Sequence, residues 1–273
     1  MTTYEELRQS KMQKLHALKT RGINPFPYQY IRTHTSKEIH EKFNSLQAGE
    51  ESTEKASVCG KIMSIRGFGK LAFLDIVDEK GKIQVQLKSG VTEEEGFELM
   101  GMLDTGDYGF AEGKIIRTQR GEISILAEKI GILSKSIAPL PDKWHGVSDI
   151  EARYRQRYVD LFMNPEVKNV FVNRAKIMKA VRNVLDRQGF VEVEIPTLQN
   201  QYGGANARPF TAHSNALDQE LYLSISPELY LKRLTIGNME RVYTIAKNFR
   251  NEDIDKTHNP EFTMMECYWA YAD

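Results

Sequence analysis

The stretch Asn248–Asp273 reads NFRNEDIDKTHNPEFTMMECYWAYAD and decides how the second half of the chain is interpreted. Its two alternating segments predict two strands, joined by a polar loop of about ten residues. The first strand ends in Arg250, and the second carries isolated polar groups. A planar guanidinium held at a rigid strand end, beside a loop that closes, suits a bound polyphosphate. We therefore expect a ligand site in this stretch.

The composition excludes several classes of protein. A length of 273 residues allows about two domains. Lys+Arg and Asp+Glu both number 37, which argues against a generally basic nucleic-acid-binding surface but leaves room for a local patch. Cys59 and Cys267 are the only cysteines, and no signal-like N-terminus or metal-type Cys/His spacing occurs, so we expect reduced thiols in a cytoplasmic protein. No apolar run approaches the roughly 20 residues of a membrane helix.

Short alternating segments dominate the first half of the chain. Two helices, at 3–20 and 35–43, and a polar linker at 49–54 come first. Strands are then predicted at 57–65, 71–77, 82–88, 108–117 and 122–130, with a helix at 92–103 after the third. Three strands, a helix and two strands is the order of an OB-fold barrel, a fold that binds oligonucleotides.

Alternation within two of these strands separates an apolar face from a polar one. Ala72, Leu74 and Ile76 share one face of the strand at 71–77, which leaves Phe73 on the opposite face. In the strand at 82–88, Gln84 lies on the polar face. An exposed aromatic ring on a polar, basic sheet face is what stacking of a nucleic-acid base requires. Packing of Phe73 under a loop or an N-terminal helix fits the alternation equally well, so both interpretations stay open.

The second half of the chain mixes helices and strands, so the fold class is α+β. We expect a charged helical segment at 149–160, a long helix at 165–188 and a strand at 190–196 that Pro196 ends. Ser226 is the predicted N-cap of a helix that runs to Gly237, and a strand follows at 240–250. The predicted parts are an N-terminal helical extension at 1–55, an OB-fold domain at 56–138, a linker at 139–160 that opens with Pro139–Asp142, and an α+β domain at 161–273.

Several motifs resemble those of the class II aminoacyl-tRNA synthetases. Arg250, its following glutamate, the loop and the PEFT sequence at 260–263 resemble motif 2 of that class, and the long helix with Gly189 and Pro196 resembles motif 1. The closer resemblance is to the lysyl-tRNA synthetase family, carried by GGA at 203–205, ARPF at 207–210, SPELYLKRL at 226–234, EFTMME at 261–266, PLPDK at 139–143 and EARYRQRY at 151–158. This family belongs to the subclass with an OB-fold anticodon-binding domain and a catalytic core built on an antiparallel sheet.

The resemblance implies activation of lysine by ATP and transfer of the lysyl group to tRNA(Lys). It assigns catalysis to Arg250, because two anions must be brought together and a guanidinium can bridge both of them. The ATP-binding residues implied by the resemblance are Arg250, Glu252, His258 and Phe262. The alternatives are an ion-paired surface arginine, a solvated loop acid, a loop-stabilising histidine and a core phenylalanine.

A lysine pocket is implied on the second strand of the stretch. Phe262, Met264, Glu266 and Tyr268 have the same parity and therefore share a face. The lysine-binding residues implied by the resemblance are Gly204, Glu228, Arg250, Glu266 and Tyr268. Two carboxylates at one pocket wall suit an ε-ammonium group, which offers three donors and one positive charge. Without the resemblance, Glu228 is an acid placed favourably near a helix N-terminus and Glu266 lies at a solvated strand edge.

The remaining implied sites concern tRNA, the dimer and the metal. Phe73, Gln84 and Arg66 match positions that contact the anticodon, and Gly189 and Pro196 belong to a motif that forms a homodimer. The third motif of the family and the acidic Mg²⁺ ligands are expected beyond Asp273. We therefore expect a piece of a longer enzyme that does not activate lysine by itself. The alternative is a non-catalytic tRNA- or partner-binding relative.

Overall fold

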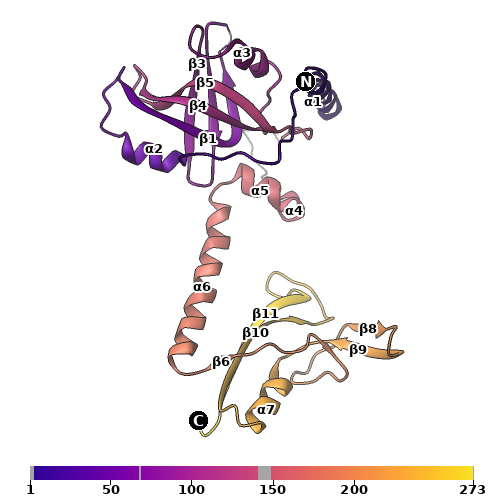
Figure 1. Cartoon of the computed structure of the whole chain (residues 1–273). Helices are drawn as coiled ribbons and strands as arrows, with labels where there is room; N and C mark the ends of the chain where they lie inside the picture. The colour runs from indigo at the N-terminus through magenta and orange to yellow at the C-terminus, as the bar shows by residue number, and fades with distance from the viewer. Residues whose placement is uncertain (1–2, 68, 141–148, 273) are drawn as a thin grey trace. The chain divides into compact units, whose positions relative to one another are not determined.

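The computed structural model describes residues 3–67, 69–140 and 149–272, which form two compact units, Met1–Met163 and Asn164–Asp273 (Figure 1). The end of the predicted linker Pro139–Asp142 lies outside the described residues. Each unit is built around its own sheet or sheets. No helix in the described ranges is long and apolar enough to cross a membrane.

The first unit contains a closed five-stranded barrel with the strand order β1-β2-β3-β5-β4. Its elements are β1 (Glu51–Arg66), β2 (Leu71–Val77), β3 (Lys82–Lys88), α3 (Glu94–Met100), β4 (Tyr108–Arg117) and β5 (Ile123–Ser134). β3 and β5 run parallel, whereas the other neighbours in the barrel are antiparallel. The predicted order of three strands, a helix and two strands is confirmed. The linker predicted at 49–54 is wrong in its second part, because β1 begins at Glu51 and pairs with Ile116 of β4 there.

The alternation of side chains along β2 determines which of them point into the barrel core. Ala72, Leu74 and Ile76 of β2 are at most 1% exposed, as the period of two predicts. The pairing of β4 with β5 shifts register between Glu112 and Gly113, where Glu128 of β5 is the extra residue. A Cβ atom at Gly113 would lie 2.0 Å from the carbonyl oxygen of Leu126, so only glycine fits this close approach.

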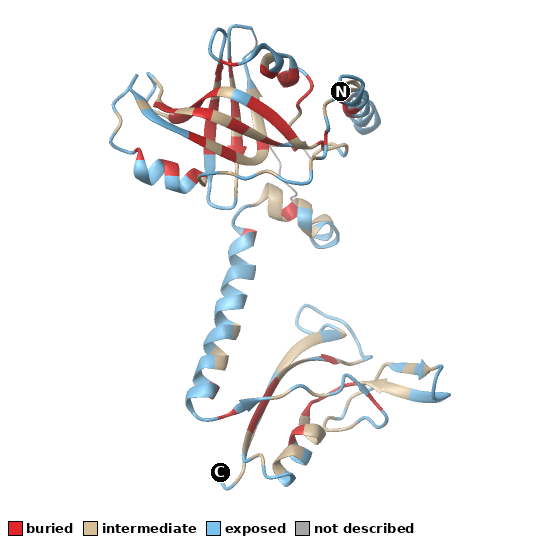
Figure 2. Ribbon diagram, in the orientation of Figure 1, coloured by how far each residue is buried: buried red, intermediate tan, exposed pale blue. Residues whose placement is uncertain are grey.

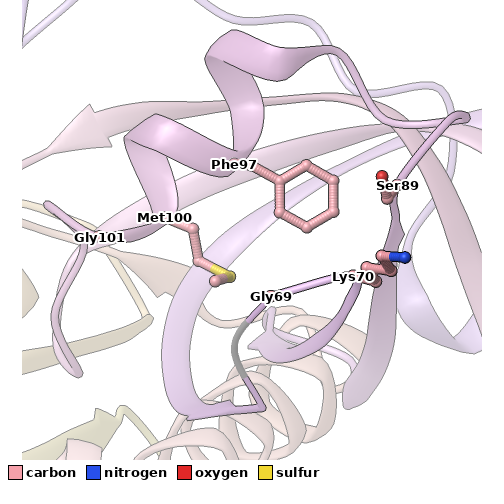
Figure 3. Close-up of a pocket in the computed structure, with 6 residues that line it drawn as sticks. All are labelled: Gly69, Lys70, Ser89, Phe97, Met100 and Gly101. Carbon is pink, nitrogen blue, oxygen red and sulfur yellow. The ribbon is translucent and has the colours of Figure 1, made fainter.

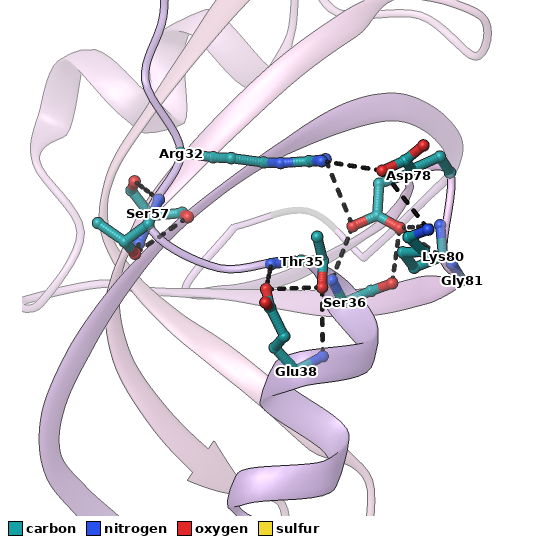
Figure 4. A network of polar contacts seen from close by, with 10 residues as sticks. Arg32, Thr35, Ser36, Glu38, Ser57, Asp78, Lys80 and Gly81 are labelled. Carbon is teal, nitrogen blue, oxygen red and sulfur yellow. Dashed lines mark hydrogen bonds and ion pairs between the residues drawn. The ribbon is translucent and has the colours of Figure 1, made fainter.

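Two helices, α1 (Tyr4–Thr20) and α2 (Ser36–Lys42), join the barrel through polar contacts. Asp78, in the turn between β2 and β3, accepts hydrogen bonds from the N–H and hydroxyl of Ser36 at the start of α2, both at 2.7 Å (Figure 4). Asp78 also accepts from the N–H groups of Lys80 and Gly81 and lies 3.8 Å from Arg32. One carboxylate therefore fixes both its own turn and the helix.

A buried ion cluster connects α1 with the end of β5. The Lys135 side chain is fully buried, and its Nζ lies 2.5 Å from Asp104 and 2.8 Å from Asp107. From α1, Lys14 pairs with Asp104 at 2.6 Å and Lys11 donates to the carbonyl of Thr105 at 3.1 Å. Lys135, Lys14, Asp104 and Asp107 each have an opposite charge beside them and so avoid the high cost of an isolated buried ion, whereas Lys11 is met by a backbone carbonyl.

The single helical segment predicted at 149–160 is two short helices, α4 (Ile150–Arg155) and α5 (Arg157–Met163). Gln156, between them, leaves the helical conformation with a ψ of 57°. The buried Asp160 binds Arg153 and Arg157, one residue from each helix, and so fixes the corner. Lys61 of the barrel lies 3.5 Å from the centre of the Phe162 ring, which holds α5 against β1.

The second unit carries two three-stranded sheets, β11-β10-β6 and β7-β9-β8. Its elements are α6 (Val167–Arg187), β6 (Val191–Glu192), β7 (Leu198–Gln199), β8 (Thr211–Ser214), β9 (Gln219–Leu223), α7 (Glu228–Ile236), β10 (Arg241–Phe249) and β11 (Glu261–Trp269). β10 and β11 are antiparallel, but β6 runs parallel to β10, so this sheet is mixed. The strand predicted at 190–196 shrinks to Val191–Glu192, because only these residues pair with β10.

Among the described residues, helix α6 has exposed apolar side chains between its two ends (Figure 2). Val167 and Leu185, at its ends, are 8% exposed, whereas Val170 is 67% and Ile177 62% exposed. Leu185 packs with Phe190 and the fully buried Tyr243 as the small core beside β10. The middle of the helix thus has an apolar face without a partner among the described residues.

Replacing Lys135 with methionine should destabilise the barrel unit by about 3–5 kcal/mol, because Asp107 is then buried without its counter-charge. Urea unfolding followed by circular dichroism measures the loss. The matched control is Lys55→Met, which breaks an exposed pair with Glu128 and should cost about 0–1 kcal/mol. Equal losses in the two variants would contradict a special role for the buried cluster.

Candidate functional site

The pairing of β10 with β11 places the predicted ligand-binding residues on one face of the sheet. The register sets Asn248 opposite Phe262, Thr244 opposite Glu266 and Val242 opposite Tyr268. Along β11, Glu266 and Tyr268 are partly buried, whereas Met265, Cys267 and Trp269, of the other parity, are exposed. Side chains that alternate in this way point to opposite sides of a strand. The shared face that the parity predicts is therefore present.

Arg250 follows directly after β10 and is held at the mouth of the loop. Its N–H donates to the carbonyl oxygen of Pro260 at 2.9 Å, which closes the loop at its base. Its guanidinium carbon lies 5.1 Å from the centre of the Phe262 ring. The Nε atom is buried and makes no hydrogen bond within the described structure. A buried donor of this kind is costly unless a ligand satisfies it.

The loop after Arg250 is held by two carboxylates. Glu252 accepts a hydrogen bond from the N–H of Arg208 at 3.1 Å, and the N–H of Asn251 donates to the carbonyl of Arg208 at 2.8 Å. Asp255 accepts from the N–H groups of Thr257 and His258 at 2.6 and 2.8 Å. Nδ1 of His258 lies 2.8 Å from the same carboxylate. Because a carboxylate only accepts, this nitrogen carries the proton, and the exposed ring presents Nε2 outwards.

Four predicted lysine-pocket residues converge around one hydroxyl. Ser226 donates to Oε1 of Glu266 at 3.0 Å, and its oxygen accepts from the N–H of Glu228 at 3.2 Å. Tyr268 approaches Oε2 of Glu266 at 3.4 Å. Gly204 has a φ of +85°, and a Cβ there would lie 2.8 Å from the Cβ of Glu228. Gly204, Glu228, Glu266 and Tyr268 are thus brought together.

The two glutamates of this cluster differ in whether a cation pairs with them. Glu228 lies in the first turn of α7, and its carboxylate pairs with Lys232, one turn further along the helix. No cation in the described ranges pairs with Glu266. Burial, together with the Glu266 and Glu228 carboxylates, raises the pKa of Tyr268 to about 12. Its hydroxyl therefore stays protonated and remains a donor at neutral pH.

A hollow of about 780 Å³ on the barrel contains all three predicted anticodon residues, Arg66, Phe73 and Gln84. Phe73 is partly buried and lies opposite Gln86 on β3. Arg66 is exposed and pairs with Asp75 at 2.9 Å. The aromatic ring thus lines a concave, polar surface rather than packing under a helix.

The prediction that Gln84 lies on an open face is wrong, because Gln84 is only 6% exposed. Its amide donates to Glu122 at 2.9 Å and its carbonyl accepts from Ser124 at 3.0 Å. Glu122, from the turn before β5, therefore covers the glutamine. Glu122 and Gln86 also line the hollow, although neither is among the predicted anticodon residues; Gln86 has the parity of the polar face.

A separate hollow of about 360 Å³ lies between α3 and the β2–β3 side of the barrel (Figure 3). Phe97 and Met100 of α3 face Gly69, Lys70 and Ser89 across it. None of the predicted site residues lines this hollow.

The two predicted dimer-motif residues lie at either end of the segment after α6. Gly189 has a φ of +78°, the left-handed conformation that glycine adopts readily at a helix end. The carbonyl of Pro196 accepts from the side chain of Gln199 at 3.0 Å. Gly189 lets the chain turn at the end of α6, and the Gln199 hydrogen bond fixes the chain at Pro196.

Two parts of the chain match models of known protein families. The model of the class II tRNA synthetases (D, K and N) matches residues 149–273, and that of the OB-fold nucleic acid binding domain matches residues 56–133. Residues 149–273 therefore form a class II tRNA synthetase domain. The second match also confirms the predicted OB-fold.

The chain is similar to curated proteins named lysine–tRNA ligase. Those of Roseiflexus sp. (strain RS-1), Pelotomaculum thermopropionicum and Methanoculleus marisnigri are 54%, 51% and 48% identical to this chain over 97–98% of its length. The alignments cover 55%, 52% and 52% of the respective relatives. The chain thus spans about half the length of the curated relatives it matches. Within the described ranges, no group of three or more His, Cys, Asp or Glu side chains could hold a metal ion.

The Asp255 turn gives a test of the loop geometry. The N–H of Thr257 and the ring of His258 hold the pKa of Asp255 well below its ordinary value of 3.8. The lowered pKa means that the turn persists at pH 3.8 and is lost only as the pH falls through the lower value. We expect the Asp255 carboxyl carbon and the Thr257 amide to titrate together below pH 3.8 in NMR spectra.

Asp255→Asn is the control for this titration, because the amide cannot ionise and the acid step of the Thr257 signal should vanish. A midpoint at or above pH 3.8 in the unmodified chain would show that the turn is not formed in solution.

Proposed function

We propose that this chain supplies the lysine- and ATP-binding part of a lysine–tRNA ligase, together with its anticodon-binding domain. The observation that carries the proposal is the carboxylate of Glu266, held by Ser226 on the sheet face that Arg250 also borders. The N–H of the second glutamate, Glu228, binds the same serine. Relatives named lysine–tRNA ligase, 46–54% identical to this chain, support it.

The proposed first step joins lysine to ATP. A carboxylate oxygen of lysine attacks the α-phosphorus, the bond to the bridging oxygen breaks, and pyrophosphate leaves. Arg250 bridges the carboxylate and an α-phosphate oxygen, which offsets the repulsion between two anions. Its buried Nε gains an acceptor in that complex. In the second step, a hydroxyl at the tRNA 3′ end attacks the lysyl carbonyl, and AMP leaves.

Three residues are proposed to hold the rest of ATP. Phe262, on the same face, offers its ring to the adenine base. Glu252 offers an acceptor to the adenine amino group, since one of its oxygens already binds Arg208 and the other is available. His258 directs Nε2 away from Asp255 and towards the leaving pyrophosphate. The family also uses Mg²⁺, but the described residues do not fit a metal ion, so we assign it no ligand in this chain.

The proposed lysine pocket reads the ε-ammonium group by charge and by hydrogen bonds. Glu266 supplies a charge that no described cation neutralises, and Tyr268 adds a hydroxyl. Glu228 is held by an exposed lysine of its own helix, a pair worth only about 0.3–0.5 kcal/mol, so a substrate ammonium competes with it easily. Gly204 lets the backbone approach the substrate amino end.

The barrel hollow is proposed as the anticodon site. Phe73 stacks on a base, Arg66 contacts the backbone or a base edge, and Gln84, fixed by Glu122 and Ser124, presents its remaining N–H group. The exposed apolar face of α6, with Val170 and Ile177, is proposed as the homodimer interface. Gly189 and Pro196 shape the segment that follows it.

The full-length protein should catalyse lysine-dependent exchange of pyrophosphate into ATP. Glu266→Gln should raise the KM for lysine by about 10–100-fold, because a hydrogen bond to a charged group is worth about 1.5–3 kcal/mol. The KM for ATP should stay within about twofold, since Glu266 contacts only the pocket hydroxyls.

The matched control is Glu261→Gln, which changes a glutamate of β11 that pairs with Lys247 and has the opposite parity. It should leave both KM values unchanged. No lysine-dependent exchange by the full-length protein, with anticodon-dependent RNA binding retained, would instead indicate a non-catalytic tRNA-binding relative.

Phe73→Ala should raise the KM for tRNA(Lys) by about tenfold or more, because base stacking on an aromatic ring is worth about 1–3 kcal/mol. Pyrophosphate exchange should be unaffected, since the barrel does not contain the pocket. Tyr28→Ala, which removes a fully exposed ring elsewhere on the first unit, is the control. Loss of exchange along with tRNA affinity would show that Phe73 is needed for folding.

A further inference from the structure

The hydroxyl of Ser226 lies between the carboxylate of Glu266 and the backbone N–H of Glu228 and is not itself a predicted ligand contact. Ser226 is 3% exposed, donates to Oε1 of Glu266 at 3.0 Å and accepts from the N–H of Glu228 at 3.2 Å. We propose that Ser226 is a positioning residue that sets the orientation of Glu266 for an ammonium-bearing substrate. This inference rests on the proposed function of the pocket.

The proton of this hydroxyl has one possible destination. A hydroxyl has one donor and two acceptor positions, and an ionised carboxylate only accepts. Ser226 must therefore donate to Glu266 and receive the hydrogen bond of Glu228 with a lone pair. The same atom thus fixes one carboxylate directly and the backbone of the second where α7 begins.

The backbone around Ser226 cannot shift easily. Ser224, two residues earlier, donates to Asn248 at 3.0 Å, and its carbonyl accepts from the N–H of Phe249 at 2.8 Å. A Cβ at Gly204 would come within 2.9 Å of the Ser226 Oγ, so the glycine segment lies directly against the hydroxyl. The serine is clamped between the end of β10 and the glycine turn.

The hydrogen bond from Ser226 limits the orientations that the Glu266 carboxylate can adopt. Ser226 holds one oxygen of Glu266. The other oxygen makes a long hydrogen bond of 3.4 Å with Tyr268 and so remains able to accept from an ammonium group. A charged group already held in its bound orientation loses less entropy when the ligand arrives. Without the hydroxyl, Glu266 keeps its charge but not its direction.

The test uses Ser226→Ala in the full-length protein. We expect the KM for lysine to rise about tenfold, equal to the loss of one charge-assisted hydrogen bond, with kcat and the KM for ATP within about twofold. Thr235→Ala is the matched control, because it removes a partly buried hydroxyl of α7 that binds the carbonyl of Leu231 and touches neither Ser226 nor a pocket carboxylate. It should leave the KM for lysine unchanged.

The double variant separates positioning from folding. If Ser226 acts through Glu266, Ser226→Ala added to Glu266→Gln should raise the KM for lysine by no more than about twofold beyond Glu266→Gln alone. Additive effects, or an unchanged KM for lysine in Ser226→Ala, overturn the positioning role. Failure of the unmodified full-length protein to exchange pyrophosphate with lysine would overturn the proposed function instead, so the two failures are distinguishable.

Discussion

The antiparallel register between β10 and β11 is the constraint on which the candidate site depends. Nine residue pairs run from Arg241 opposite Trp269 to Phe249 opposite Glu261. A slip by one residue would turn every side chain of β11 to the other face. Phe262, Glu266 and Tyr268 would then leave the face that Arg250 borders, and Met265 and Cys267 would take their places. Backbone hydrogen bonding thus decides which chemistry the face offers.

Much of this arrangement was predictable because it follows from local periodicity. The order of the barrel strands, the inward set Ala72, Leu74 and Ile76, and the common parity of Glu266 and Tyr268 all depend on a period of two. The helix α6 was predictable from its apolar stripe and its glycine end. In each case the residues that carry the signal are close together in the chain.

The remainder depends on contacts between residues distant in the sequence. Gln84 has the parity of an exposed residue, but Glu122 and Ser124, about forty positions later, cover it. The segment after Gly189 alternates over several residues, yet it stays next to β10 only through Val191 and Glu192 and one further backbone hydrogen bond from Val193. Ser226 was predicted only as a helix cap, because nothing in the sequence shows that Glu266 lies within reach of its hydroxyl. Periodicity fixes the direction of a side chain but not what it meets.

Buried carboxylates paired with lysine or arginine differ from Glu266, whose partners are hydroxyl groups. Asp104, Asp107 and Asp160 are each paired with lysine or arginine, so their charges are already neutralised and they serve the fold. Glu266, in contrast, is partly buried and is met in the described structure by two hydroxyls only. Hydroxyls orient a carboxylate without cancelling its charge, and partial burial strengthens its attraction for a cation. A carboxylate that is fixed in direction but lacks a counter-charge is suited to recognise a ligand, and this contrast supports the proposal that an ammonium group binds at Glu266 rather than at the buried ion pairs.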